Sequence, residues 1–107
     1  RGLMVHTDND YLGRIAQYCR DELNIEHNLE INVALTCLKE DGALGWCYDL
    51  HDNEIDIELD KWQDEKSMGI TLCHEMVHAK QFAMGLKPNE DEAVGLEQIL
   101  YDGFIKL

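Results

Sequence analysis

The pentapeptide His-Glu-Met-Val-His at residues 74–78 constrains the structure of this chain more than any other part of its sequence. Histidines four residues apart lie on the same face of an α-helix, where both imidazoles reach one metal ion. A glutamate directly after the first histidine lies beside the ion and takes a proton from the attacking water, a pattern typical of zinc metalloproteases. The pentapeptide therefore predicts a helix on which His74 and His78 are metal ligands and Glu75 is the general base.

The sequence on both sides of the pentapeptide favours a long helix. Residues 66–73 lead into it and residues 79–84 lead out of it, and neither segment contains a proline. Asp64 or Ser67 is expected to cap the N-terminus of this helix, and Gly85 is expected to end it. Apolar residues recur close to the helical spacing, which places the helix in the core. Two histidines on a core helix need polar partners, so a bound metal is favoured over a buried pair without a ligand.

The first half of the chain predicts one helix and two strands. Residues 8–23 form an amphipathic helix with Thr7 as the expected N-cap, and its apolar stripe consists of Leu12, Ile15, Ala16, Cys19 and Leu23. Residues 31–38 are apolar on both faces, which is typical of a central strand. Residues 44–50 alternate, with Leu, Trp, Tyr and Leu on one face, and this pattern indicates a second strand.

Residues 54–59 show the clearest period-two alternation in the chain, with Ile, Ile and Leu on one face and acids on the other. This pattern predicts an exposed or edge strand. Asn89 is expected to cap a last helix that continues to about Phe104. The chain is thus expected to form an α+β fold, which consists of a helix, an antiparallel or mixed sheet of about three strands, and two further helices. A length of 107 residues predicts a single domain that spans residues 1–107.

The composition is strongly acidic, with 22 acidic and 9 basic residues and a net charge of −13. Such a surface repels nucleic acid and anionic lipid, which bind clusters of Lys and Arg. It attracts cationic peptides or basic proteins, so a cationic peptide or protein substrate is the expected partner. The longest apolar runs are too short for a membrane span or a signal peptide, and we expect a cytoplasmic protein without membrane contact.

The cysteines do not indicate a structural zinc site, because Cys19, Cys37, Cys47 and Cys73 include no Cys-x-x-Cys pair. Each of them lies in an apolar stretch, which predicts four buried and reduced thiols. A disulfide between Cys37 and Cys47 across a hairpin is the alternative. His6 and His27 lie outside the predicted helices and are expected to face solvent.

A third metal ligand is expected after the pentapeptide, because a catalytic zinc has three protein ligands and one open position. A helix that reverses direction after Gly85 would bring either Glu90 or Glu92 back to the metal. Glu90 falls closer to the apolar face of the last helix and is aligned with Glu97. This alignment favours Glu90, and Glu92 stays the alternative.

Three features of the second half of the chain resemble those of the gluzincin metallopeptidases. They are the acidic strand at residues 54–60, the run from His74 to Gln81, and the Pro-x-Glu-x-Glu-Ala element at residues 88–93. The combination is most similar to very small gluzincin-like domains that occur in phage-type sequences. This resemblance implies a zincin-like fold, a Zn²⁺ ion and a glutamate ligand on the last helix. Members with a Glu-x-x-Ala pattern place the ligand at the position of Glu90, whereas other gluzincins place it at that of Glu92.

The implied chemistry is metal-assisted hydrolysis of a peptide bond. Tyr48, His51 and Tyr101 are candidates to stabilise the transition state, and each of them also fits a structural role. Glu97 is a candidate hydrogen-bond acceptor for one of the ligand imidazoles. The strand at residues 54–60 is expected to border the cleft and to hold an extended peptide by strand addition.

Three classes of function are compatible with this sequence. The leading prediction is a minimal zinc metallopeptidase. The second is a regulatory or interaction module of the same fold that binds zinc and cleaves nothing, because so small a domain has little wall for a substrate cleft. The third is a protease that acts on nucleic-acid-bound proteins, and the net charge of −13 argues against it. The sequence does not define an oligomeric state.

Overall fold

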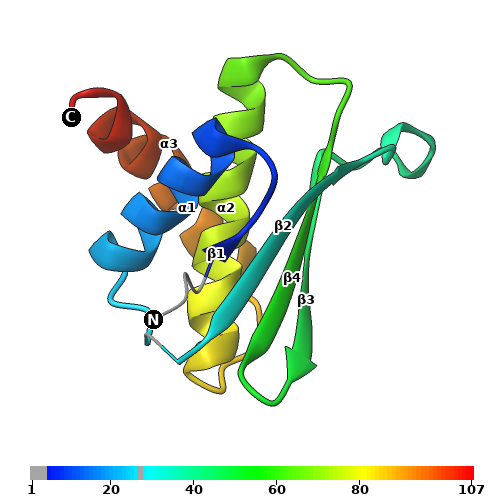
Figure 1. Ribbon diagram of the computed structural model, residues 1–107. Helices are drawn as coiled ribbons and strands as arrows, with labels where there is room; N and C mark the ends of the chain where they lie inside the picture. Colours follow the sequence, from blue (N-terminus) through cyan, green and yellow to red (C-terminus); the bar gives the residue numbers. More distant parts are fainter. Residues whose placement is uncertain (1–4, 27) are drawn as a thin grey trace.

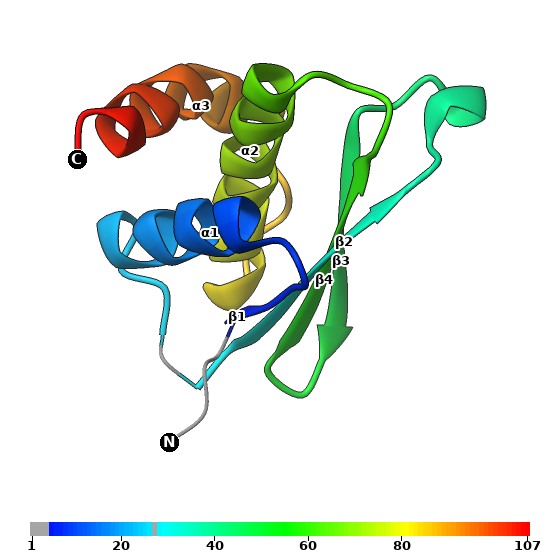
Figure 2. The ribbon, with the colours of Figure 1, turned by 45° about the horizontal axis from the view of Figure 1, so that its top comes forward.

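Three α-helices cover one face of a four-stranded sheet in the computed structural model, which describes residues 5–26 and 28–107 (Figure 1). The elements in chain order are β1 (Val5–His6), α1 (Asp10–Glu22), β2 (Glu30–Thr36), a short 3-10 helix (Lys39–Asp41), β3 (Gly45–His51), β4 (Glu54–Asp60), α2 (Glu65–Ala83) and α3 (Glu90–Ile105). Figure 2 shows all three α-helices on the same side of the sheet, and the predicted α+β class is confirmed. His27 lies outside the described residues.

The strand order β1-β2-β4-β3 makes the sheet mixed, because β4 pairs in parallel with β2 and antiparallel with β3. The prediction that residues 54–59 form an edge strand is therefore wrong. Period-two alternation indicates that one face of a strand is exposed to solvent. It carries no information about which strands pair with it in the sheet. β3 forms one edge of the sheet, and the two-residue strand β1, which the sequence pattern did not predict, forms the other edge.

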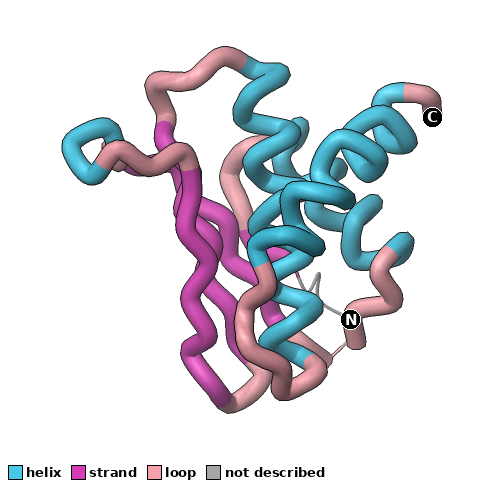
Figure 3. Tube along the Cα trace, turned by 180° about the vertical axis from the view of Figure 1, so that it is seen from behind, coloured by secondary structure: helices cyan, strands magenta, loops and turns pink. Residues whose placement is uncertain are grey.

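The core lies between the sheet and the helices. Ile55, Ile57 and Leu59 of β4 are buried there, and the carboxylates of Glu54, Asp56 and Glu58 point to the uncovered face. The carboxylate of Asp60, the last residue of β4, is buried and accepts a hydrogen bond from the N–H of Leu38. The apolar stripe of α1 is buried over four of its five predicted positions, namely Leu12, Ile15, Ala16 and Cys19. Figure 3 shows from the opposite side that the three α-helices form one layer and the strands another. The sequence periodicity of α1 and β4 thus identified the buried faces.

The ends of the helices depend on local hydrogen bonds. Asn9, rather than the predicted Thr7, caps α1, and its Oδ1 accepts a hydrogen bond from the backbone N–H of Leu12 at 3.0 Å. The hydroxyl of Thr7 instead accepts from the N–H of Asn9, so it stabilises the preceding turn. Asp64 caps α2, and Asn89 caps α3 as predicted.

The exposed residues of the hairpin lie on its outer face. Leu44, Trp46, Tyr48 and Leu50 share one face as predicted, and they are 42–52% exposed.

All four cysteines are free thiols. Cys19 and Cys73 are buried as predicted, whereas Cys47 is only half-buried. Cys37 is exposed, because it follows the last residue of β2 and leaves the packed layer. Among the described residues, no helix combines the length and the apolar character that a membrane span requires.

Candidate metal centre

The pentapeptide lies in the second half of α2, and its two histidines share one face of that helix as predicted. The ring centroids of His74 and His78 are 5.0 Å apart. Both side chains are largely shielded from solvent, with 17% and 6% of their surface exposed. Gly85 has a φ of 73° directly after the C-cap residue Met84, so the chain turns away from α2 in a conformation that favours glycine.

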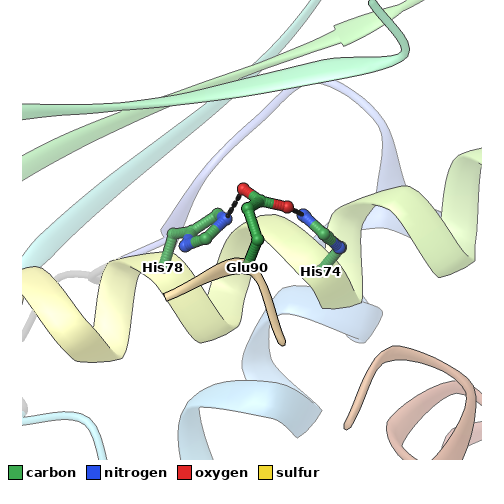
Figure 4. A group of neighbouring side chains, drawn as sticks. All are labelled: His74, His78 and Glu90. Atoms are coloured by element: carbon green, nitrogen blue, oxygen red, sulfur yellow. Dashed lines mark hydrogen bonds and ion pairs between the residues drawn. The ribbon is translucent and has the colours of Figure 1, made fainter. Parts of the chain in front are cut away.

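The turn after Gly85 returns the first residue of α3 to the two histidines. The carboxylate of Glu90 lies between them, with Oε1 at 3.0 Å from Nε2 of His74 and Oε2 at 2.7 Å from Nε2 of His78 (Figure 4). One donor atom from each of the three residues lies within 4.8 Å of the other two. Glu92 has a different partner, because its Oε1 accepts a hydrogen bond from Nε2 of Gln81 at 2.8 Å.

The second nitrogen of each imidazole is engaged by another side chain. Nδ1 of His74 lies 2.7 Å from Oε1 of Glu97, the contact that the sequence had suggested. Nδ1 of His78 lies 2.8 Å from Oε1 of Gln81, which sequence reasoning did not identify. The signal available was its position three residues after His78 on the same helix. Both contacts direct Nε2 toward Glu90, as outer partners of metal-binding histidines do.

This donor set fits zinc. Two imidazole nitrogens and one carboxylate are a common ligand set for catalytic zinc, which keeps a further position open. The donors of His74, His78 and Glu90 converge from two helices, and the two Nδ1 contacts hold the imidazole rings in place.

Glu75 lies beside this cluster, and only 6% of the residue is exposed. Burial raises the pKa of its carboxyl group above the usual value for glutamate, the nearby His74 and His78 lower it, and the acids Glu90 and Glu97 raise it again. A carboxylate with a raised pKa accepts a proton more readily near neutral pH, which suits a general base.

The backbone of β3 approaches Glu75 closely at Gly45. A β-carbon at this position would lie 3.2 Å from Oε2 of Glu75 and 2.7 Å from the methyl group of Thr71. The glycine therefore lets β3 run directly alongside α2, the helix that carries the two histidines. The sequence pattern of the strand gave no indication of this contact, because it depends on the packing of β3 against α2.

A cavity of about 830 Å³ opens between the start of β3 and the helices α2 and α3. His74, Glu75, His78 and Glu90 all line it, together with apolar side chains such as Ile70 and Phe82. Residues 43–47 form its opposite wall. The prediction that the strand at residues 54–60 borders the cleft is therefore wrong, because this strand is central and β3 lies between it and solvent.

The three candidates for transition-state stabilisation do not line the cavity. The hydroxyl of Tyr101 lies 3.2 Å from that of Tyr11. Tyr48 donates a hydrogen bond to Glu58 on the outer face of the sheet. His51 is at the turn between β3 and β4, and 83% of its side chain is exposed. The two tyrosines thus contact other side chains outside the cavity, and the side chain of His51 faces solvent.

Comparison with known proteins leaves the chain without a match. No protein-family model matches it, and neither a curated protein nor a solved structure does.

Proposed function

We propose that this protein is a zinc-dependent metallopeptidase of the gluzincin type, with a zincin-like arrangement of its helices and sheet. The observation that carries the proposal is the common cavity: three convergent metal donors and a buried glutamate with a raised pKa line the same open space. A perturbed acid beside a cluster of ligands in a cleft is the usual signature of an active site.

His74, His78 and Glu90 would hold the zinc ion. When bound there, zinc supplies Lewis-acid chemistry, in which it polarises a peptide carbonyl and lowers the pKa of water toward about 7. Glu75 accepts the proton of the attacking water and transfers it to the leaving amine. Glu97 and Gln81 keep the two imidazoles oriented, because each contacts an Nδ1 atom.

The open edge of β3 supports a peptide as the substrate. An edge strand presents unpaired N–H and C=O groups to which an extended chain can add. Residues 43–47 begin this strand and line the cavity, so a peptide along this edge would pass in front of Glu75 and the metal donors. The acids Asp64, Glu75, Glu90 and Glu97 outnumber the single cation Lys66 in the lining, which favours peptides with Lys or Arg.

Metal analysis combined with a peptide-library digest tests this function. The purified protein is expected to hold one zinc per chain, and the zinc-loaded protein is expected to cleave peptides. Glu75→Ala removes the base but no ligand, so it should keep the zinc and lose about 10²–10⁴-fold in turnover. Glu65→Gln, which changes an exposed acid at the start of the same helix, serves as the matched control and should cleave normally.

Each alternative has its own outcome in this experiment. A protein that holds zinc but cleaves no peptide in a broad library would be the non-catalytic module that the sequence also allows. Cleavage by Glu75→Ala at the wild-type rate would contradict the role of Glu75. If the wild-type protein in excess zinc does not bind one metal ion per chain, the proposal as a whole is wrong.

A further inference from the structure

The side chain of Gln81 uses all of its hydrogen-bonding capacity although it is only 2% exposed. Its Oε1 lies 2.8 Å from Nδ1 of His78 and accepts a hydrogen bond from the backbone N–H of Asn89 at 2.9 Å. Its Nε2 donates to the backbone carbonyl of Asn89 at 3.1 Å and to Oε1 of Glu92 at 2.8 Å. A primary amide has two acceptor sites and two donors, so no capacity is left over.

The surroundings of the amide leave only one orientation for it. The N–H of Asn89 only donates, so the atom that faces it must be the oxygen of Gln81. The carbonyl of Asn89 and the carboxylate of Glu92 accept, so the atom that faces them must be the nitrogen. A reversed amide would place donor against donor and acceptor against acceptor, and buried groups without partners are costly.

This orientation determines the tautomer of His78. Because Oε1 of Gln81 only accepts, Nδ1 of His78 has to carry a hydrogen and donate it. When the ring is neutral, the lone pair is therefore on Nε2, the nitrogen that lies together with the donors of His74 and Glu90 around the candidate metal position. A lone pair on Nε2 is what a metal ligand requires.

We infer that Gln81 is a positioning residue of the metal centre, which selects the ligand tautomer of His78 and joins the two helices that carry the ligands. The second role follows from its bonds to Asn89 and Glu92, because these residues flank Glu90 at the start of α3. One buried amide thus aligns a ligand of α2 and the ligand of α3 at the same time. The inference rests on the proposed function, since it concerns the same metal.

Cobalt-loaded protein provides a test that does not depend on turnover. Ring N–H protons of histidines on Co²⁺ give strongly shifted proton NMR signals that vanish in D₂O. The wild-type protein should show one such signal for His74 and one for His78. Gln81→Met keeps the size of the side chain but removes the acceptor, so the His78 signal should be lost to exchange with water while that of His74, which is held by Glu97, stays.

Zinc affinity gives the second readout of this experiment. Loss of an outer partner of a metal ligand typically costs about 10- to 100-fold in affinity, and we expect this loss for Gln81→Met. Gln98→Met is the matched control, because Gln98 lies on the exposed side of α3 and bonds Asp102. It should leave both NMR signals and the zinc affinity unchanged.

A double variant separates positioning from a general effect on folding. Gln81→Glu combined with Glu92→Gln exchanges the amide and the acid of one contact and keeps an acceptor for Nδ1 of His78. It should retain the His78 signal. It should recover only part of the affinity that Gln81→Met loses, because a carboxylate at residue 81 cannot donate to the backbone carbonyl of Asn89 as the amide does. If Gln81→Met retains both signals and wild-type affinity, or if the double variant loses the His78 signal, the inference is wrong. A wild-type protein that takes up neither Co²⁺ nor Zn²⁺ would instead refute the proposed function itself.

Discussion

At the scale of single residues, the two glutamates at the start of α3 have separate environments although only one residue lies between them. Glu90 faces both imidazoles, whereas Glu92 accepts a hydrogen bond from Gln81. Side chains two positions apart on an α-helix are rotated by about 200° around the helix axis, so the two carboxylates cannot point in the same direction. Periodicity had favoured Glu90 as the third ligand, and its carboxylate is the one that lies against the two imidazoles.

We therefore predict that Glu90→Gln and Glu92→Gln differ in zinc affinity. Glu90→Gln replaces a charged donor with a neutral amide and should lower the affinity by at least about tenfold. Glu92→Gln keeps an oxygen that accepts from Gln81 and should bind zinc within a few-fold of wild type. Competition titration with a chromophoric chelator measures both constants. A larger loss of affinity for Glu92→Gln would mean that Glu92, and not Glu90, is the third ligand.

At the scale of the elements, close approach between the helices depends on a glycine of α2. A β-carbon at Gly69 would lie 2.5 Å from the ring of Tyr101 on α3 and 2.9 Å from the hydroxyl of Tyr11 on α1. Tyr101 is buried and its hydroxyl contacts that of Tyr11, so neither ring is free to move aside. All three helices thus meet at a position that has no side chain, five residues before the pentapeptide begins.

Two alanine variants test this junction. Gly69→Ala should destabilise the protein, because overpacking costs about 1–3 kcal/mol and outweighs the better helix propensity of alanine. Gly95→Ala on α3 meets no atom within 4 Å and should stabilise the protein by about 0.5–1 kcal/mol. Urea denaturation gives both values. Equal stabilisation by the two substitutions would mean that α2 and α3 do not pack as described.

At the scale of the whole molecule, a bound metal would link the turn between α2 and α3 to the core. The three donors lie on these two helices, and α2 packs against the sheet and α1 through the buried residues Leu72, Cys73 and Met76. A ligand that binds only the folded state raises the apparent free energy of unfolding by mass action.

We predict that zinc raises the melting temperature of the wild-type protein and that a chelator lowers it. At a free zinc concentration of 100 times Kd the stabilisation is about 2.7 kcal/mol. For a domain of this size each kcal/mol corresponds to roughly 4–8 °C. His78→Ala, which lacks one donor, should show a much smaller shift in the same thermal scan. A wild-type melting temperature that does not respond to confirmed removal of zinc would contradict a site formed by folded helices.

Features that depend on neighbours along the chain were predictable from the residues alone. The i, i+4 histidines predicted a helix with both rings on one face, the alternation at residues 54–59 identified the buried face of a strand, and Asn89 predicted the start of α3. These properties follow from backbone geometry and local hydrogen bonds, which a few residues define.

Two features depend on packing between distant segments, namely which strand borders the cleft and how the histidines are oriented. The alternation of β4 is the same for a central strand and an edge strand, and pairing with β2 and β3 made it central. The amide of Gln81 acquires its orientation from Asn89 and Glu92, which lie 8 and 11 residues away. Strand order and the directions of buried hydrogen bonds depend on packing between distant segments, and local periodicity contains no information about them.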